Sequence, residues 1–171
     1  MEAIEMKSPI GKLTLVADGD ALVGVYLETY EAPNAERRST PALERAATQL
    51  REYFAGTRET FDLELQPRGT EFQRAVWSAL GEIPFGHTVS YAHVAKRIGR
   101  PSAVRAVGAA NGQNPIALII PCHRVVGSDG SLTGYGGGLP RKKWLLAHET
   151  RQRALWAPSP AGRRLKTVNA S

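Results

Sequence analysis

The chain has 171 residues, of which 42% are hydrophobic and 22% charged, as is typical of a globular protein with one sizeable domain or two small ones. Its single cysteine excludes an intramolecular disulfide and any structural zinc site that needs several thiolates. The formal net charge of +6 favours a polyanionic partner, a property shared with many other basic proteins.

The four histidines are scattered without the spacing of metal ligands, so we expect no metal and no other cofactor. No apolar run approaches the length that a membrane span needs. The first residues, Met1 to Glu5, carry acids where a signal peptide would carry positive charge. We therefore expect a cytoplasmic protein that does not enter a membrane.

The first part of the chain predicts a small α/β domain over residues 1–66. Two β-prone runs, 12–17 and 21–27, flank Asp18-Gly19-Asp20 and predict a hairpin. Residues 31–39 are polar and predict a surface loop.

A helix should follow this loop. Thr40-Pro41 supplies an N-cap and a first-turn proline, and Gly56 ends the run of apolar residues at helical spacing. Residues 61–65 then alternate as a strand would. The domain boundary is expected near Gln66-Pro67-Arg68-Gly69.

The second domain, residues 67–150, should be mainly helical. Thr70 and Gln73 have the spacing of a capping box. Ser90 can cap a helix that runs to Ile98, and a further helix should run from Pro101-Ser102 to about Asn111. Two short helices joined by a tight turn that contains glycine suggest a helix-turn-helix.

The second of these helices has an unusually flat outer face. Its inward face should hold Ala103, Val107 and Ala110, and its opposite face carries a single long cation among small residues: Arg105, Gly108, Ala109 and Gly112. Such a surface allows close approach to DNA. A tightly packed internal helix with a solvated arginine fits the pattern equally well.

The end of the chain carries the candidate chemistry. Residues 116–120 are apolar on both faces, as in a buried strand, and lead to Pro121-Cys122-His123-Arg124. A glycine-rich loop, 134–138, precedes a last helix. Residues 151–171 are basic and weakly periodic, and we expect them to be largely disordered.

Cys122 is the candidate nucleophile. A lone cysteine is usually a small buried hydrophobic residue, but here a strand end should bring it toward solvent, and cationic neighbours favour the reactive thiolate. His123 could take its proton through a turn or a bridging water. Glu149 could orient that imidazole, or could be a solvated carboxylate at a helix end.

These residues carry a specific resemblance. Pro121-Cys122-His123-Arg124-Val125 resembles the active-site signature of the O6-alkylguanine-DNA alkyltransferases. Other family motifs occur in the same order, and only the tail after about Arg151 lies outside the match: Ser8-Pro9-Ile10-Gly11, Ile83-Pro84-Phe85-Gly86, Ser90-Tyr91, Arg105-Ala106-Val107-Gly108, Asn114-Pro115, Gly134-Tyr135-Gly136-Gly137-Gly138 and Leu145-Leu146-Ala147-His148-Glu149.

The resemblance implies an N-terminal α/β domain of ribonuclease-H-like topology and a C-terminal, mainly α domain with a helix-turn-helix of winged-helix-like type. It also implies catalytic roles. Cys122 would accept the alkyl group, His123 would activate it through a water, Glu149 would orient the histidine, and Asn114 would brace the helix against the active site.

The resemblance further implies a double-stranded DNA partner that contains O6-alkylguanine, bound through the minor groove by a monomer. Tyr91 would press on a phosphate and Arg105 would fill the stack left by a flipped nucleotide, while Gly108 and Ala109 allow close approach. The implied pocket for the flipped guanine is lined by Tyr135, Val125, Gly136 and Gly137.

The implied activity is direct-reversal repair, with stoichiometric and irreversible transfer from O6-alkylguanine to Cys122. O4-alkylthymine is left open as a second substrate. Gly136 stands where some relatives carry serine, which leaves the range of accepted alkyl groups open. The cysteines that bind zinc in some relatives are missing here, which again predicts no metal.

Three other functions fit parts of the pattern. A non-catalytic lesion sensor would replace the acceptor cysteine, commonly with tryptophan, so Cys122 argues against it. A cysteine hydrolase usually brings its histidine from a distant segment, and the flat helix would have no purpose there. A transcriptional regulator would use the helix-turn-helix alone. Activity on an alkylguanine substrate separates these classes.

Overall fold

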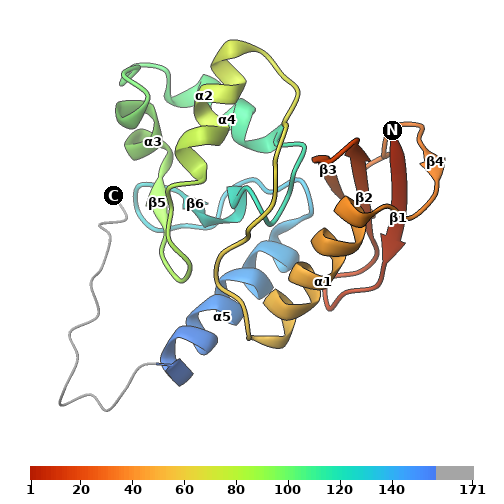
Figure 1. Cartoon of the computed structure of the whole chain (residues 1–171). Coiled ribbons are helices and arrows are strands. Elements are labelled where there is room, and N and C mark those ends of the chain that lie inside the picture. Colours follow the sequence, from red (N-terminus) through yellow and green to blue (C-terminus); the bar gives the residue numbers. More distant parts are fainter. Residues whose placement is uncertain (157–171) are drawn as a thin grey trace.

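The computed structural model describes residues 1–156 and comprises an N-terminal sheet-and-helix unit and a C-terminal, mainly helical unit (Figure 1). Buried apolar side chains from both units form one continuous core. Within the described residues, no helix is long and apolar enough to cross a membrane.

The N-terminal unit is built on a sheet of four strands in the order β3-β2-β1-β4. The expected hairpin is confirmed: β2 (Leu13–Asp18) and β3 (Ala21–Leu27) pair antiparallel. The sequence analysis missed β1 (Glu2–Met6), antiparallel to β2, and β4 (Glu36–Arg37), parallel to β1 within the expected loop.

One face of this sheet is covered by α1 (Pro41–Ala55). The helix begins as expected, with the Thr40 side chain accepting a hydrogen bond from the Leu43 amide, and Gly56 ends it in the left-handed region at φ 81°. Residues 61–65 do not form the expected strand. Only Leu65 pairs, through an isolated bridge to Leu22, because the segment runs between the two units.

The C-terminal unit begins with α2 (Glu71–Leu80), where the predicted capping box of Thr70 and Gln73 is present. The short strand β5 (Val89–Ser90) leads into α3 (Tyr91–Arg97), capped by Ser90 as expected. A turn connects α3 to α4 (Val104–Gly112), which starts two residues later than predicted. The helices α3 and α4 pack against each other and against α2.

The apolar segment 116–120 is buried but is not the strand that its pattern suggested. It is a compact turn in which Leu118 has φ 72°, with only one isolated bridge, from Ile116 to Val25. A buried turn needs the same apolar side chains as a buried strand, so periodicity could not separate the two. The turn ends at a short 3-10 helix, η1 (Cys122–Arg124).

The last helix, α5 (Leu139–Trp156), runs past the point where disorder was expected. Residues 151–156 therefore belong to a helix, and the remainder of the predicted tail lies outside the described residues. Glu149 consequently lies within a helix rather than at its end. Before α5, the chain forms β6 (Val125–Val126), which pairs parallel with β5.

Candidate active site and DNA-binding face

Cys122 lies at the start of η1 and is 6% exposed, so it is buried rather than open to solvent as its expected place at a strand end had suggested. Burial raises the pKa of the thiol above its ordinary value. A hydrogen bond with the Asn114 side chain and the positive charge of Lys142 partly oppose this effect. The cationic influence on the thiol therefore comes from Lys142 on α5, which the sequence analysis did not identify.

The next residue, His123, is fully buried, and its Nε2 lies 2.7 Å from Oε2 of Glu149. An ionised carboxylate can only accept hydrogen bonds, so Nε2 carries the proton and Nδ1 is left as an acceptor. Nδ1 has no hydrogen-bond partner among the described protein groups. Glu149, which was expected to orient this imidazole, therefore contacts it directly.

The charges of this group are set by burial and by Arg124. Burial lowers the pKa of His123 below its ordinary value, although Glu149 opposes the shift, so the ring is neutral at physiological pH. Burial alone would raise the pKa of Glu149, but His123 and Arg124 together lower it well below its ordinary value. Glu149 is therefore an ionised carboxylate within the core.

Arg124 provides the countercharge. Its Nε and Nη2 donate to the two oxygens of Glu149 at 2.8 and 3.0 Å, and its Nη1 donates to the Ile83 carbonyl at 2.7 Å. A bidentate guanidinium suits a buried carboxylate because both oxygens are satisfied. From the sequence, Arg124 was expected only to be a cationic neighbour of the cysteine, and this structural role was not predicted.

A small cavity adjoins the thiol. It has a volume of about 20 Å³ and is lined by residues of both units, among them Cys122, Asn114, Tyr135, Gly136 and Gly137. The hydroxyl of Tyr135 is buried and has no hydrogen-bond partner among the described protein groups, so it can donate to a bound molecule. The predicted pocket residues therefore come together, with one exception.

That exception is Val125, which does not line the cavity. Its carbonyl accepts a hydrogen bond from Nζ of the fully buried Lys142 at 2.5 Å. The predicted brace, Asn114, donates to the carbonyl of Ile120 at 2.7 Å and so holds the turn before the cysteine. The side-chain amide of Asn111 donates to the Cys122 carbonyl at 3.3 Å, a contact that had not been predicted.

The predicted DNA-contacting residues share one region of the C-terminal unit. Arg105 and Ala109 are exposed on α4, which carries Gly108 between them. The first residue of α3, Tyr91, packs near Gly108, where an added Cβ would lie 3.9 Å from its ring, and its hydroxyl donates to the Thr133 carbonyl at 3.4 Å. The small residues of α4 thus leave one cation projecting from a flat face.

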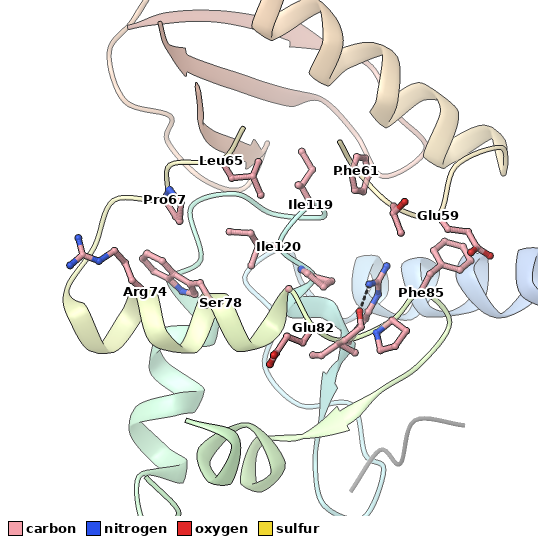
Figure 2. A pocket seen from close by; sticks show the side chains of 17 residues that line it. Glu59, Phe61, Leu65, Pro67, Arg74, Ser78, Glu82, Phe85, Ile119 and Ile120 are labelled. Atoms are coloured by element: carbon pink, nitrogen blue, oxygen red, sulfur yellow. Dashed lines mark hydrogen bonds between the residues drawn. The ribbon is translucent and has the colours of Figure 1, made fainter. Parts of the chain in front are cut away.

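A larger cavity of about 620 Å³ lies at the junction of the two units (Figure 2). Side chains such as Phe61 and Leu65 face Ile119 and Ile120 across it. Cys122 and His123 do not line this cavity, although Arg124, the partner of Glu149, does. Among residues 1–156, no group of three or more His, Cys, Asp or Glu side chains could hold a metal ion.

The fold and the site together define a class: a two-unit protein in which two packed helices present a flat face with one cation, and a buried cysteine is followed by a histidine that is hydrogen-bonded to a carboxylate. Comparison with known sequences is more specific. The model of the ribonuclease-like domain of 6-O-methylguanine DNA methyltransferase matches residues 4–67, and the model of the DNA-binding domain of the same protein matches residues 71–151.

The methylated-DNA–protein-cysteine methyltransferase of Mycolicibacterium paratuberculosis is 53% identical over 147 residues, covering 84% of this chain and 89% of that protein. The enzyme of the same name from Methanosarcina acetivorans is 48% identical over 147 residues, covering 84% and 94%. The crystal structure of Mycobacterium tuberculosis OGT in complex with DNA superposes with a TM-score of 0.85 at 47% identity, covering 89% and 94%.

The chain belongs to the 6-O-methylguanine DNA methyltransferase family. Members of this family repair DNA by direct reversal, in which the alkyl group passes from the DNA to a cysteine of the protein. The expectation drawn from the sequence motifs is confirmed at the level of family and reaction.

Proposed function

We propose that the chain removes the alkyl group from O6 of guanine in double-stranded DNA and transfers it, once and irreversibly, to Sγ of Cys122. The observation that carries the proposal is the arrangement around the chain's only cysteine. Neighbouring His123 donates through Nε2 to Glu149 at 2.7 Å, which leaves Nδ1 as the base. This is the arrangement that activates a cysteine for attack on carbon.

The reaction balances without a cofactor. His123 takes the thiol proton through a water, and the thiolate sulfur attacks the alkyl carbon. The S–C bond forms while the C–O6 bond breaks, and its electron pair leaves with the guanine, which is finally reprotonated. The Tyr135 hydroxyl donates a hydrogen bond to the base and stabilises the developing charge. Asn114 holds the turn that places Cys122.

The product is a thioether, and no second cysteine exists to displace the alkyl group. Each protein molecule therefore acts once. O4-alkylthymine presents the same alkyl–oxygen bond to the thiolate, and its use depends on how the pocket accepts a pyrimidine.

The lesion must leave the base stack to reach a buried thiol, which costs a few kcal/mol of unstacking. We assign Arg105 as the side chain that fills the vacated space, offsetting part of that cost, and Tyr91 as the contact to the neighbouring phosphate. Gly108 and Ala109 allow α4 to approach the minor groove closely. A monomer carries all of these groups.

We also propose the topology of each domain and the cellular location of the protein. We assign ribonuclease-H-like topology to the N-terminal domain, 1–66, and a winged-helix-like helix-turn-helix to the C-terminal domain, 67–150. We place the protein in the cytoplasm, where a reducing environment keeps a lone thiol free.

The test is the intact mass of the protein after incubation with a duplex that contains one O6-methylguanine, beside a Cys122→Ala variant. We expect the mass of one methyl group to be added to the wild type, to saturate at one per protein and to be missing from the variant. Lesion binding without a mass gain would instead identify a damage sensor. Equal gain in the variant would place the acceptor elsewhere.

A further inference from the structure

Tyr53 connects the N-terminal helix α1 to the proposed reaction centre. It is fully buried, and its hydroxyl donates a hydrogen bond of 2.6 Å to Oε2 of Glu149. The same carboxylate oxygen is the one that His123 Nε2 contacts at 2.7 Å. A side chain of the N-terminal unit thus shares an acceptor atom with the proposed catalytic base.

The position of this hydroxyl is tightly determined. The Tyr53 ring packs edge-on against Phe85 at 6.1 Å and against His148 at 5.3 Å between ring centroids. His148 Nε2 lies 2.8 Å from the Tyr53 carbonyl and so holds its backbone as well. Because the core is closely packed, the ring cannot turn its hydroxyl elsewhere without disturbing these neighbours.

We propose that Tyr53 is a positioning residue for the alkyl transfer: it fixes the Glu149 carboxylate that orients and polarises His123. The proposal rests on the assignment of Cys122 as acceptor and His123 as its base. It means that the N-terminal domain contributes directly to the reaction centre through α1.

Three donors share the negative charge of one carboxylate oxygen. Glu149 Oε2 accepts from His123 Nε2, from Tyr53 Oη and from Arg124 Nη2, the last at 3.0 Å. Each donor draws on the same negative charge, so the loss of one strengthens the others. Without the tyrosine hydroxyl, the carboxylate would hold an imidazolium more strongly and would be less well fixed in place.

Besides its burial, which lowers the pKa of His123, three charged groups act on this imidazole. Glu149 raises its pKa, while Arg124 and Lys142 lower it. Tyr53 acts through Glu149, and the pKa values of both tyrosines near this carboxylate, Tyr53 and Tyr135, are raised well above the ordinary value by burial, so both stay neutral. Removing the Tyr53 hydroxyl changes no net charge but takes one hydrogen-bond donor from Glu149. The carboxylate then stabilises protonated His123 more strongly, so we expect the pKa of His123 to rise.

The first experiment measures single-turnover alkyl transfer from an O6-methylguanine duplex between pH 5 and pH 8 in the Tyr53→Phe variant. We expect the plateau rate to fall roughly tenfold, as for other residues that orient a reacting side chain. We also expect the acid limb of the profile to move to higher pH. Tyr26→Phe, which removes a half-buried hydroxyl of β3 away from the site, is the matched control and should behave as the wild type.

The pH profile separates positioning from folding. With rates normalised to the folded fraction at each pH, a purely structural tyrosine would leave the plateau rate and the acid limb unchanged, and that result would overturn the proposal. The wild type must gain one methyl group at Cys122 in the same assay. If it does not, the proposed function fails first, independently of Tyr53.

A second variant tests the proposal with the ring and hydroxyl kept. 3-Fluorotyrosine placed at position 53 has a more acidic phenol and is a stronger donor to Glu149. It should therefore move the acid limb to lower pH, opposite in sign to Tyr53→Phe. Combining Tyr53→Phe with Glu149→Gln should add little to the effect of Glu149→Gln alone, whereas additive losses would contradict action through Glu149.

Discussion

Gly136 lies directly beneath the hydroxyl of Tyr30, so close that a Cβ added to the glycine would come within 1.3 Å of that oxygen. The tyrosine belongs to the N-terminal unit and the glycine to the loop before α5. Tyr30 also lines the cavity of about 20 Å³ next to Cys122, and its hydroxyl donates to the Gly112 carbonyl at 3.5 Å. The Tyr30 ring is therefore one of the side chains that limit the size of this cavity.

This relationship predicts that Tyr30 limits the size of the alkyl group. Tyr30→Ala should accelerate transfer from O6-benzylguanine in DNA by more than it accelerates transfer from O6-methylguanine. Removing the ring creates space for the bulkier group, and 45% exposure of Tyr30 makes its loss well tolerated. Single-turnover rates on both duplexes measure the ratio. Tyr30→Phe keeps the ring and should keep the wild-type ratio, and an unchanged ratio in Tyr30→Ala would contradict the prediction.

The buried ion pair of Arg124 with Glu149 predicts a large loss of stability. Arg124→Met leaves an ionised carboxylate in the core without its countercharge, which typically costs about 3–5 kcal/mol. The exposed pair Arg97–Glu82, at 2.6 Å, is the control, and Arg97→Met should cost less than about 1 kcal/mol. Urea unfolding at pH 7 measures the free energy of unfolding of both variants. Equal losses would show that the buried pair contributes no more to stability than the exposed one.

The two shifted groups also predict how stability depends on pH. The folded-state pKa of His123 lies below its ordinary value of 6.5, so the unfolded chain binds the proton more readily and stability is lost as pH falls below about 6.5. The folded-state pKa of Glu149 is lowered too, so its contribution is present above about pH 4.5 and is lost as the pH falls further.

Unfolding free energies measured in urea between pH 8 and pH 4 test whether stability falls on acidification. The slope between pH 6.5 and pH 5 should shrink in His123→Gln and persist in His93→Gln, a half-buried histidine on α3. A wild-type protein that gains stability on acidification through this range would refute the assigned direction.

The flat face of α4 predicts a separate effect on DNA. Arg105→Ala should weaken binding to an O6-methylguanine duplex more than binding to an undamaged duplex, because the proposed role of this side chain requires that a nucleotide has left the stack. Arg45→Ala, on the exposed side of α1, removes the same charge elsewhere. Titration of labelled duplexes measures both affinities, and equal losses on the two duplexes would reduce Arg105 to a phosphate contact.

Local signals in the sequence were sufficient wherever the structure depends on neighbouring residues. The N-cap at Thr40, the capping box at Thr70 and the hairpin turn at Gly19 each act within a few positions, and all three were predicted. The motif around Cys122 pointed to the proposed nucleophile and to its proposed histidine together, because the two are adjacent in the chain.

Long-range relationships were not predictable in this way. Tyr53 has the spacing of an ordinary core residue of an amphipathic helix, and nothing in that pattern indicates that its hydroxyl reaches Glu149, 96 positions away. Segment 116–120 has the composition of a buried strand, and only the backbone of Leu118, at φ 72°, distinguishes the turn that forms instead. In both cases, tertiary packing decides what a local pattern leaves open.

Lys142 illustrates the same limit and carries the last prediction. Its neighbour Lys143 is exposed, whereas Lys142 is fully buried and donates to the carbonyls of Val125 and Thr133 at 2.5 and 2.9 Å. The charge of this amino group is one of the influences that lower the pKa of Cys122 against the effect of burial.

Lys142→Met should therefore raise the pKa of the Cys122 thiol, while Lys143→Met should leave it unchanged. The rate of modification by iodoacetamide, measured against pH, reports the thiolate directly and does not require DNA. The profile of the first variant should move to higher pH. The variant also leaves two carbonyls without their donor, at about 1–3 kcal/mol each, so thermal unfolding must first establish a temperature at which it remains folded. An unmoved profile in folded Lys142→Met would show that burial and the hydrogen bonds to the thiol set its pKa without a contribution from Lys142.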